Sequence, residues 1–325
     1  MIDLSTTYGG LSLKSPLIVS SSGLTSSVDR IKQMARAGAG AVVLKSLFEE
    51  QIMFEAGALS AESDYPEADD YVRAYARENS LGDYLSLIRE AKREVDIPVI
   101  ASINCVQSDE WTDFAHKIQE AGADALELNI YFLAMDKDKD PRTYEKAYLD
   151  LITKVKEKTT MPVMVKLGNR CTNIPWMVHQ LYLRGAASVV LFNRFYHPDI
   201  NTDDFTFGSA EVLSSPADLR IPLRWIGIVS SQVKEIDLAA STGVHSGMAA
   251  VKLILAGATT VQVCSVLYRN GIDYISDMIE EMKKWMEKNR YESPADFRGK
   301  MNYSNLKDPS IYERAQFMKY FSNMH

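Results

Sequence analysis

The chain has few cysteines, fewer basic than acidic residues and no long apolar runs. Its three cysteines, Cys105, Cys171 and Cys264, are too few and too widely spaced for a disulfide framework or a zinc-ligand motif. This scarcity indicates a reducing compartment, the cytoplasm, and predicts no metal site. Acidic residues outnumber basic ones, 43 to 36, and the resulting net charge of −7 at pH 7 argues against a nucleic-acid partner.

Apolar runs are short as well. No stretch approaches the roughly 18 residues that a membrane-spanning helix needs. The first residues, MIDLSTTYGGLSLKSP, lack both the basic and the apolar segment of a signal peptide. We therefore expect a cytoplasmic protein with no membrane partner. The hydrophobic content of 46% is sufficient for a large core.

Short apolar strands alternate with amphipathic helices along most of the chain. The predicted strands are Pro16–Ser20, Ala41–Leu44, Pro98–Ile103, Ala125–Asn129, Pro162–Leu167, Ser188–Phe192, Asp237–Ser241 and Thr260–Val263. The predicted helices are Asp29–Ala37, Asp83–Arg93, Glu110–Ala121, Thr143–Lys158, Pro175–Arg184, Arg224–Lys234, Ser246–Ala256 and Asp273–Asn289. Strands of this kind predict a parallel sheet covered by helices. Eight such units favour a closed α/β barrel, the (β/α)8 or TIM barrel, over an open doubly wound sheet. We expect residues 1–325 to form one barrel domain.

Three predicted loops are longer than a usual connection. They are residues 48–80, 130–142 and 193–223, and each follows a strand. Loops that follow the strands of such a barrel lie at its C-terminal face, where barrel enzymes carry out their chemistry. The long loops therefore predict an active site there, although oligomer contacts would also account for them.

The stretch Ala239–Leu267 has the pattern of strand, turn, helix, turn and strand. Its turns, Thr242-Gly243 and Cys264-Ser265, follow the last two predicted strands. In a barrel these turns lie side by side, and their backbone N–H groups with a helix N-terminus can bind a phosphate. Glycine at position 243 permits close approach of the backbone. A plain βαβ unit explains the pattern equally well.

The predicted strands end in an unusual set of polar residues. These ends are Ser20-Ser21-Ser22-Gly23, Lys45-Ser46, Asn104-Cys105, Asn129, Lys166 and Asn193-Arg194. A lysine that ends an apolar strand, such as Lys166, either needs an anionic partner or extends to solvent. Two lysines and three asparagines at one barrel mouth predict a site for a polar planar ligand, with positive charge where negative charge develops.

These motifs resemble those of the dihydroorotate dehydrogenase family of flavin-dependent (β/α)8 barrels, from about Leu4 to Lys300. The resemblance is carried by Ser21-Ser22-Gly23, Lys45-Ser46, Leu126-Glu127-Leu128-Asn129, Val165-Lys166-Leu167, Asn193, the two turns described above and the stretch Tyr291–Lys300. It implies FMN as the cofactor. The flavin contacts that it implies come from Ser22, Gly23, Lys45, Ser46, Asn104, Asn129, Lys166, Asn193, Thr242, Gly243, Cys264 and Ser265.

The resemblance also implies an oxidoreductase of pyrimidine biosynthesis that transfers a hydride between a dihydropyrimidine-like substrate (dihydroorotate/orotate) and flavin N5. The catalytic candidates are Lys45, Asn129 and Lys166, and Lys166 would lie near flavin N1. The candidates for substrate binding are Lys45, Asn79, Asn129, Asn193 and Arg194; Arg194 would bind a carboxylate or else pair with Asp203 or Asp204. A homodimer and a soluble electron acceptor or partner subunit complete the expectation.

One departure from the family concerns the catalytic base. Where the family continues Leu-Ser-Cys-Pro-Asn or Leu-Ser-Ser-Pro-Asn after its asparagine, this chain has Ile130-Tyr131-Phe132-Leu133-Ala134. The base position falls on Phe132, which cannot accept a proton, and a second substrate asparagine falls on Ala134. Tyr131, assisted by Lys45, is either a replacement base or a packing residue.

Three alternatives therefore stay open. The first is a flavoprotein that acts on a different cyclic or unsaturated substrate, and the second is a non-catalytic flavin-binding paralogue. The third is an aldolase-type barrel in which Lys166 forms a Schiff base.

Overall fold

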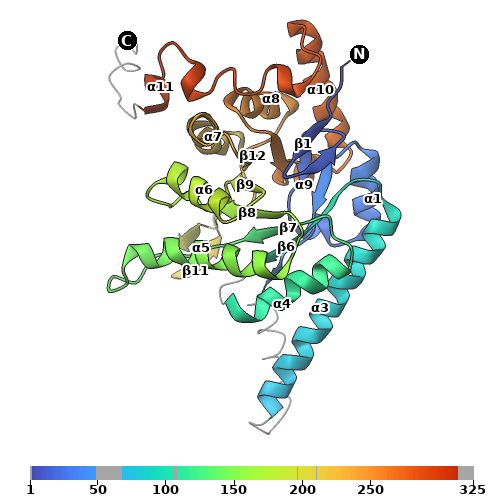
Figure 1. Ribbon diagram of the computed structural model, residues 1–325, viewed down its shortest axis with the longest axis vertical. Coiled ribbons are helices and arrows are strands. Elements are labelled where there is room, and N and C mark those ends of the chain that lie inside the picture. The colour runs from blue at the N-terminus through green and yellow to red at the C-terminus, as the bar shows by residue number, and fades with distance from the viewer. Residues whose placement is uncertain (1, 49–67, 105–107, 196, 210, 314–325) are drawn as a thin grey trace.

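The eight predicted strands close into a parallel barrel (Figure 1). The computed structural model describes residues 2–48, 68–104, 108–195, 197–209 and 211–313. The barrel strands are β3 (Leu17–Val19), β4 (Ala41–Val43), β6 (Val99–Asn104), β7 (Ala125–Asn129), β8 (Val163–Leu167), β9 (Ser188–Leu191), β12 (Asp237–Ser241) and β13 (Thr260–Val263). They pair in the order β4-β3-β13-β12-β9-β8-β7-β6, and β4 pairs with β6 to close the ring. The predicted (β/α)8 fold is confirmed.

Helices surround this barrel (Figure 1). They are α1 (Val28–Arg36), α3 (Ala68–Glu94), α4 (Ser108–Glu120), α5 (Pro141–Lys158), α6 (Ile174–Leu183), α7 (Arg220–Gln232), α8 (Gly247–Ala256), α9 (Ser265–Asn270), α10 (Tyr274–Asn289) and α11 (Ser310–Glu313). Side-chain caps begin several of them, as where Ser246 accepts a hydrogen bond from the backbone N–H of Ala249 at the start of α8. None of the described helices is long and apolar enough to cross a membrane.

The buried side chains form two clusters. The larger one fills the layer between strands and helices, as the near-continuous apolar strands predict. The smaller one fills the barrel interior and consists of Tyr8, Leu13, Ile18, Ala41, Val43, Ile100, Ala125, Met164, Val190 and Ala239. The interior is therefore a packed core, and space for a ligand remains only at its ends.

A short hairpin closes the N-terminal end of the barrel. Strands β1 (Thr6–Tyr8) and β2 (Leu11–Leu13) pair antiparallel, and the side chains of Tyr8 and Leu13 complete the interior cluster. The N–H of Gly9 in the hairpin turn donates to Asp237 Oδ2 at 2.9 Å, at the start of β12. The C-terminal end is left as the open mouth.

The predicted long loops are partly structured. Helix α3 begins at Ala68, so the expectation of a loop as far as residue 80 is wrong. Residues 68–80 contain three Ala and two Arg, which favour a helix, but they lack the apolar periodicity on which the prediction relied. Residues 193–223 contain the hairpin of β10 (Pro198–Asn201) and β11 (Thr206–Ser209), the 3-10 turn η2 (Pro216–Leu219) and the start of α7. Three residues separate the end of β4 from the short strand β5 (Leu47–Phe48), which pairs with the end of β6.

Candidate active site

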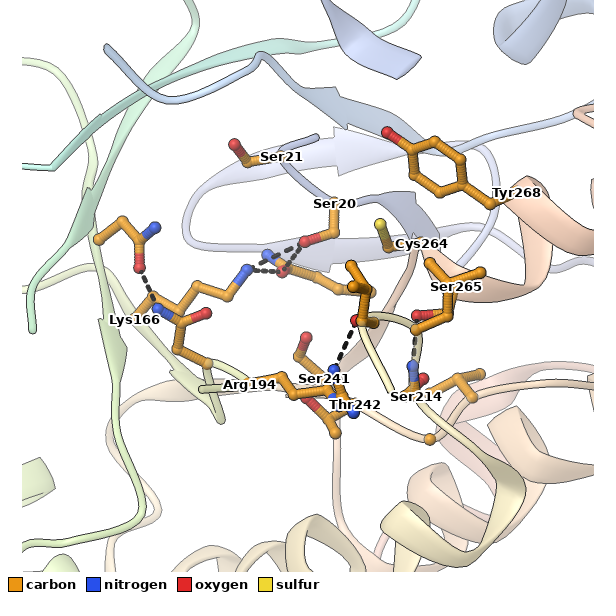
Figure 2. Close-up of a pocket in the computed structure, with 17 residues that line it drawn as sticks. Ser20, Ser21, Lys166, Arg194, Ser214, Ser241, Thr242, Cys264, Ser265 and Tyr268 are labelled. Carbon is orange, nitrogen blue, oxygen red and sulfur yellow. Dashed lines mark hydrogen bonds between the residues drawn. The ribbon is translucent and has the colours of Figure 1, made fainter. Parts of the chain in front are cut away.

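The barrel mouth contains a cavity of about 490 Å³. Its lining residues come from the C-terminal ends of the strands and the loops that follow them (Figure 2). They are Ser20, Ser21, Asn129, Lys166, Asn193, Arg194, Val212, Leu213, Ser214, Ser241, Thr242, Gly243, Val244, Gln262, Cys264, Ser265 and Tyr268. Eight of the predicted site residues are in this set: Asn129, Lys166, Asn193, Arg194, Thr242, Gly243, Cys264 and Ser265.

The Lys166 ammonium is held by a buried polar network. Its Nζ donates to Ser20 Oγ at 2.9 Å and to Gln262 Oε1 at 2.8 Å (Figure 2). It also lies 3.5 Å from Glu127 Oε1, and the Lys166 and Glu127 side chains are 5% and 0% exposed. Gln262 Nε2 donates to the other oxygen of Glu127 at 2.6 Å. Lys166 therefore has the anionic partner that a buried cation needs, and does not extend to solvent.

The two strand-end asparagines contact each other at the mouth. Asn193 Nδ2 donates to Asn129 Oδ1 at 2.8 Å, and Asn129 Nδ2 donates to Ser46 Oγ at 3.5 Å. Ser46 Oγ also lies 3.0 Å from Ser21 Oγ and 2.8 Å from Ser102 Oγ. These side chains form a continuous neutral network, of which Ser21, Asn129 and Asn193 line the cavity, and their amide and hydroxyl groups suit a ring with amide groups at its edge.

The two turns predicted to bind phosphate lie together on the other side of the cavity. Thr242 and Gly243 have φ values of 84° and 79°, and Cys264 is the N-cap residue of α9. A Cβ at position 243 would lie 2.1 Å from the backbone nitrogen of Leu219, so only glycine fits there. Burial raises the pKa of the Cys264 thiol, so it stays protonated near neutral pH.

The two turns Thr242-Gly243 and Cys264-Ser265 are called the phosphate cup below. A segment of residues 211–215, the strap, crosses beside this cup. Arg194 donates from Nη1 to the carbonyl of Val212 at 2.5 Å and from Nη2 to that of Glu211 at 2.6 Å. The Ser214 N–H donates to Ser265 Oγ at 2.9 Å, and Ser214 Oγ lies 3.0 Å from Nε2 of His245. Burial, and the charge of nearby Arg269, lower the pKa of His245, which favours the neutral ring.

The expectation that Arg194 pairs with Asp203 or Asp204 is therefore wrong. Its guanidinium is taken up by two backbone carbonyls, because the strap passes within reach of the end of β9. Binding of a carboxylate by Arg194 would require both bonds to break.

The loop after β7 does not contribute to the lining of the first cavity. Phe132 packs edge-on against Tyr148 of α5, with ring centroids 5.1 Å apart, and Tyr131 stacks on Phe195 at 4.1 Å. Together with Ala134 they line a second cavity of about 300 Å³. The side chains at both altered family positions thus lie outside the lining of the first cavity. Tyr131 acts in the structure as a packing residue.

The other predicted residues lie around the first cavity. Ser22 caps the 3-10 turn η1 (Gly23–Thr25) by accepting from the N–H of Leu24, and a Cβ on Gly23 would contact the Tyr268 hydroxyl at 3.1 Å. Lys45 and Asn104 are half-buried, just beyond β4 and at the end of β6. The side chain of Asn79 and all of Cys105 are outside the described residues.

Sequence reasoning missed three important residues of the site. Gln262 and Glu127 are polar residues inside apolar strands, TVQV and ALELN, and that interruption was the available signal. Ser214 gave none, because its role depends on how a long loop folds back over the mouth. Among the described residues, no group of three or more His, Cys, Asp or Glu side chains is placed to hold a metal ion.

Comparison with known proteins gives consistent results. The family model described as dihydroorotate dehydrogenase matches residues 79–286. The catalytic subunit of dihydroorotate dehydrogenase B (NAD⁺) from Methanocella arvoryzae is 31% identical over 281 residues, 81% of this chain and 86% of the relative. The corresponding subunit from Thermoplasma volcanium is 26% identical over 308 residues, 90% of this chain and 96% of the relative. The NAD-dependent dihydropyrimidine dehydrogenase subunit PreA of Escherichia coli K12 is 23% identical over 325 residues, 92% of this chain and 77% of the relative.

Proposed function

Since the chain belongs to the dihydroorotate dehydrogenase family, we propose that it is an FMN-dependent oxidoreductase that acts on a CH–CH bond of a dihydropyrimidine-like ring. The observation that carries the proposal is the buried Lys166 ammonium, which is held at the mouth between a phosphate cup and a pair of asparagines. We further propose that residues 1–325 act as one barrel domain.

The cup fits the phosphate of FMN. The turns at Thr242-Gly243 and Cys264-Ser265 lie at one side of the cavity, with the hydroxyl of Ser265 between them and the strap. Because a Cβ at position 243 would strike the backbone of Leu219, the turn can keep this tight geometry only with glycine. Backbone amides and hydroxyls in this arrangement bind a phosphate without any arginine.

FMN, when bound, supplies the two-electron chemistry, exchanging a hydride at N5 and carrying negative charge near N1 when reduced. Lys166 places a positive charge at the mouth and thereby favours the reduced form. Asn129 and Asn193 orient the ring of the substrate, and half-buried Lys45 donates to it or to the flavin. Ser22, Gly23, Ser46 and Asn104 complete the flavin contacts in this proposal.

The identity of the ring depends on the missing base. The described lining of the cavity contains no carboxylate and no imidazole, and its one thiol, Cys264, has a raised pKa. This lining therefore contains no carboxylate, imidazole or thiolate that could act as the base and remove a proton from dihydroorotate. This observation favours a second candidate, a flavoprotein that reduces or oxidises another unsaturated ring.

The aldolase alternative fits less well. A lysine that forms a Schiff base must be neutral to attack a carbonyl. Lys166 instead lies 3.5 Å from a fully buried carboxylate and donates two hydrogen bonds, an arrangement that favours the charged ammonium.

The names of the relatives indicate the kind of partner. Two are catalytic subunits of NAD⁺-dependent enzymes and one is a subunit of an NAD-dependent dehydrogenase. We propose that this chain likewise passes electrons to a partner subunit or a soluble acceptor, as a homodimer in the cytoplasm, in pyrimidine metabolism.

An anaerobic titration tests the proposal. The purified protein, reconstituted with FMN, is titrated with dihydroorotate and, in parallel, with dihydrouracil, while the visible absorbance of the oxidised flavin is followed. Bleaching by either compound supports the dihydropyrimidine assignment and identifies the ring. FMN binding without bleaching by either supports the second candidate, and failure to bind FMN contradicts the proposal.

A further inference from the structure

The carboxylate of Glu127 lies in the barrel interior, beneath the mouth. Its side chain is 0% exposed, and its Oε1, 3.5 Å from Lys166 Nζ, accepts no hydrogen bond from the described residues. Its Oε2 accepts from Gln262 at 2.6 Å. A buried charge is costly unless it is compensated, so this carboxylate has a strong requirement for the lysine.

Gln262 fixes the geometry of this pair. Its amide oxygen accepts from Lys166 and its amide nitrogen donates to Glu127, which excludes the flipped orientation as long as both charges are present. An ammonium has three donors. Two of them are used by Gln262 and Ser20, so the third can point either to Glu127 or into the cavity.

The electrostatic consequence concerns the flavin. A lone lysine at the mouth would stabilise a reduced, anionic flavin strongly, because a charge in a low-dielectric site is poorly screened. A carboxylate 3.5 Å behind that lysine makes the pair close to neutral and offsets much of this stabilisation. The lysine then orients the flavin more than it charges its surroundings.

We propose that Glu127 is the counter-ion that sets the reduction potential of the bound flavin, by partly neutralising Lys166, and that Gln262 is the positioning residue that holds the two charges in register. The inference rests on the proposed function. It assigns to this site a flavin of lower potential than Lys166 alone would give, suited to exchanging electrons with a low-potential acceptor of the nicotinamide class.

The test measures the two-electron midpoint potential of the FMN-loaded protein between pH 5.5 and 8.5. Glu127→Gln removes the carboxylate with little change of shape, and the potential becomes more positive. We expect roughly a tenfold change in the ratio of reduced to oxidised flavin at fixed applied potential, about 30 mV for a two-electron couple.

Two further variants complete the design. Glu127→Asp keeps the carboxylate but withdraws it from Lys166 by one methylene, so the potential becomes more positive by a smaller amount, which keeps the proposal testable if Glu127→Gln does not fold. Glu157→Gln removes the same charge from an exposed position on α5 and leaves the potential unchanged.

The possible failures are distinguishable. If the wild-type protein binds FMN but neither Glu127→Gln nor Glu127→Asp moves the potential in the stated direction, the counter-ion role is overturned and the proposed function stands. A wild-type protein that binds no FMN overturns both.

Discussion

Phe132, which the resemblance to the family places at the position of the catalytic base, packs outside the lining of the first cavity. The ring lies edge-on to Tyr148 and lines the second cavity, outside the lining of the first. A cysteine placed at this position would therefore start from a backbone that directs it away from the asparagine pair. Restoring the residue type does not restore the geometry that general-base catalysis needs.

We predict that Phe132→Cys gives no gain in the rate at which dihydroorotate reduces the flavin. Loss of a half-buried ring should lower the free energy of unfolding by about 1–3 kcal/mol. Stopped-flow reduction and urea unfolding measure the two effects. Phe207→Cys, on the exposed β10–β11 hairpin, is the matched control and should change neither. A tenfold gain in reduction rate for Phe132→Cys would show that the loop can turn its side chain to the mouth.

Individual site residues were predictable where a strand supplied them. Asn129 ends β7, Lys166 is the last residue but one of β8, and Asn193 lies two residues beyond β9; the barrel brings such ends together whatever the loops do. The partner of Lys166 was not predictable in the same way. That Glu127, Gln262 and Ser20 meet at one nitrogen depends on the stagger of three strands around the barrel, which no local pattern encodes.

Among the loops, the strap is the element that adapts the mouth to its ligand. Residues 211–215 are fixed by Arg194 at one end and by Ser214 with Ser265 at the other. Val212, Leu213 and Ser214 thereby line the cavity next to the phosphate cup. In this structure the two bonds from Arg194 to backbone carbonyls hold the strap in place, and its role in substrate binding stays a prediction.

We predict that Arg194→Met speeds the dissociation of FMN by about tenfold to a hundredfold. A hydrogen bond from a charged group contributes about 1.5–3 kcal/mol, and 1.4 kcal/mol corresponds to a factor of ten. Flavin fluorescence after dilution gives the rate. Arg224→Met, an exposed arginine of α7, should leave it unchanged. An unaltered FMN dissociation rate together with a raised KM only for carboxylate-bearing substrates would instead make Arg194 a substrate ligand.

Elements with an apolar period were predicted well, and elements without one were missed. The predicted helix Ser246–Ala256 is α8 with Ser246 as its cap, because small apolar residues and a final glycine mark it clearly. The hairpin β10–β11 was missed because its side chains are exposed on both faces and show no alternation. The first half of α3 was missed for the same reason.

Across the whole molecule, the two ends of the barrel have separate tasks. The N-terminal end is closed by the β1–β2 hairpin, whose Tyr8 and Leu13 fill the interior, while the C-terminal end carries the polar cavity. The division follows from chain direction in a parallel barrel, in which residues at the strand starts serve stability and those at the strand ends serve chemistry. Stability and ligand binding should therefore be separable by substitution.

We predict that Leu13→Ala lowers the free energy of unfolding by about 2–5 kcal/mol, because it leaves a cavity among the buried side chains of the interior cluster. The affinity of the folded protein for FMN should stay within about twofold, since the mouth lies at the other end of the barrel. Urea unfolding of the apoprotein and a fluorescence titration with FMN measure these quantities. Leu183→Ala, on an exposed position of α6, should change stability by less than about 0.5 kcal/mol. If Leu13→Ala lowered the free energy of FMN binding by as much as it lowered the free energy of unfolding, the interior core would have to transmit strain from the N-terminal end of the barrel to the mouth. The two ends would then not be independent.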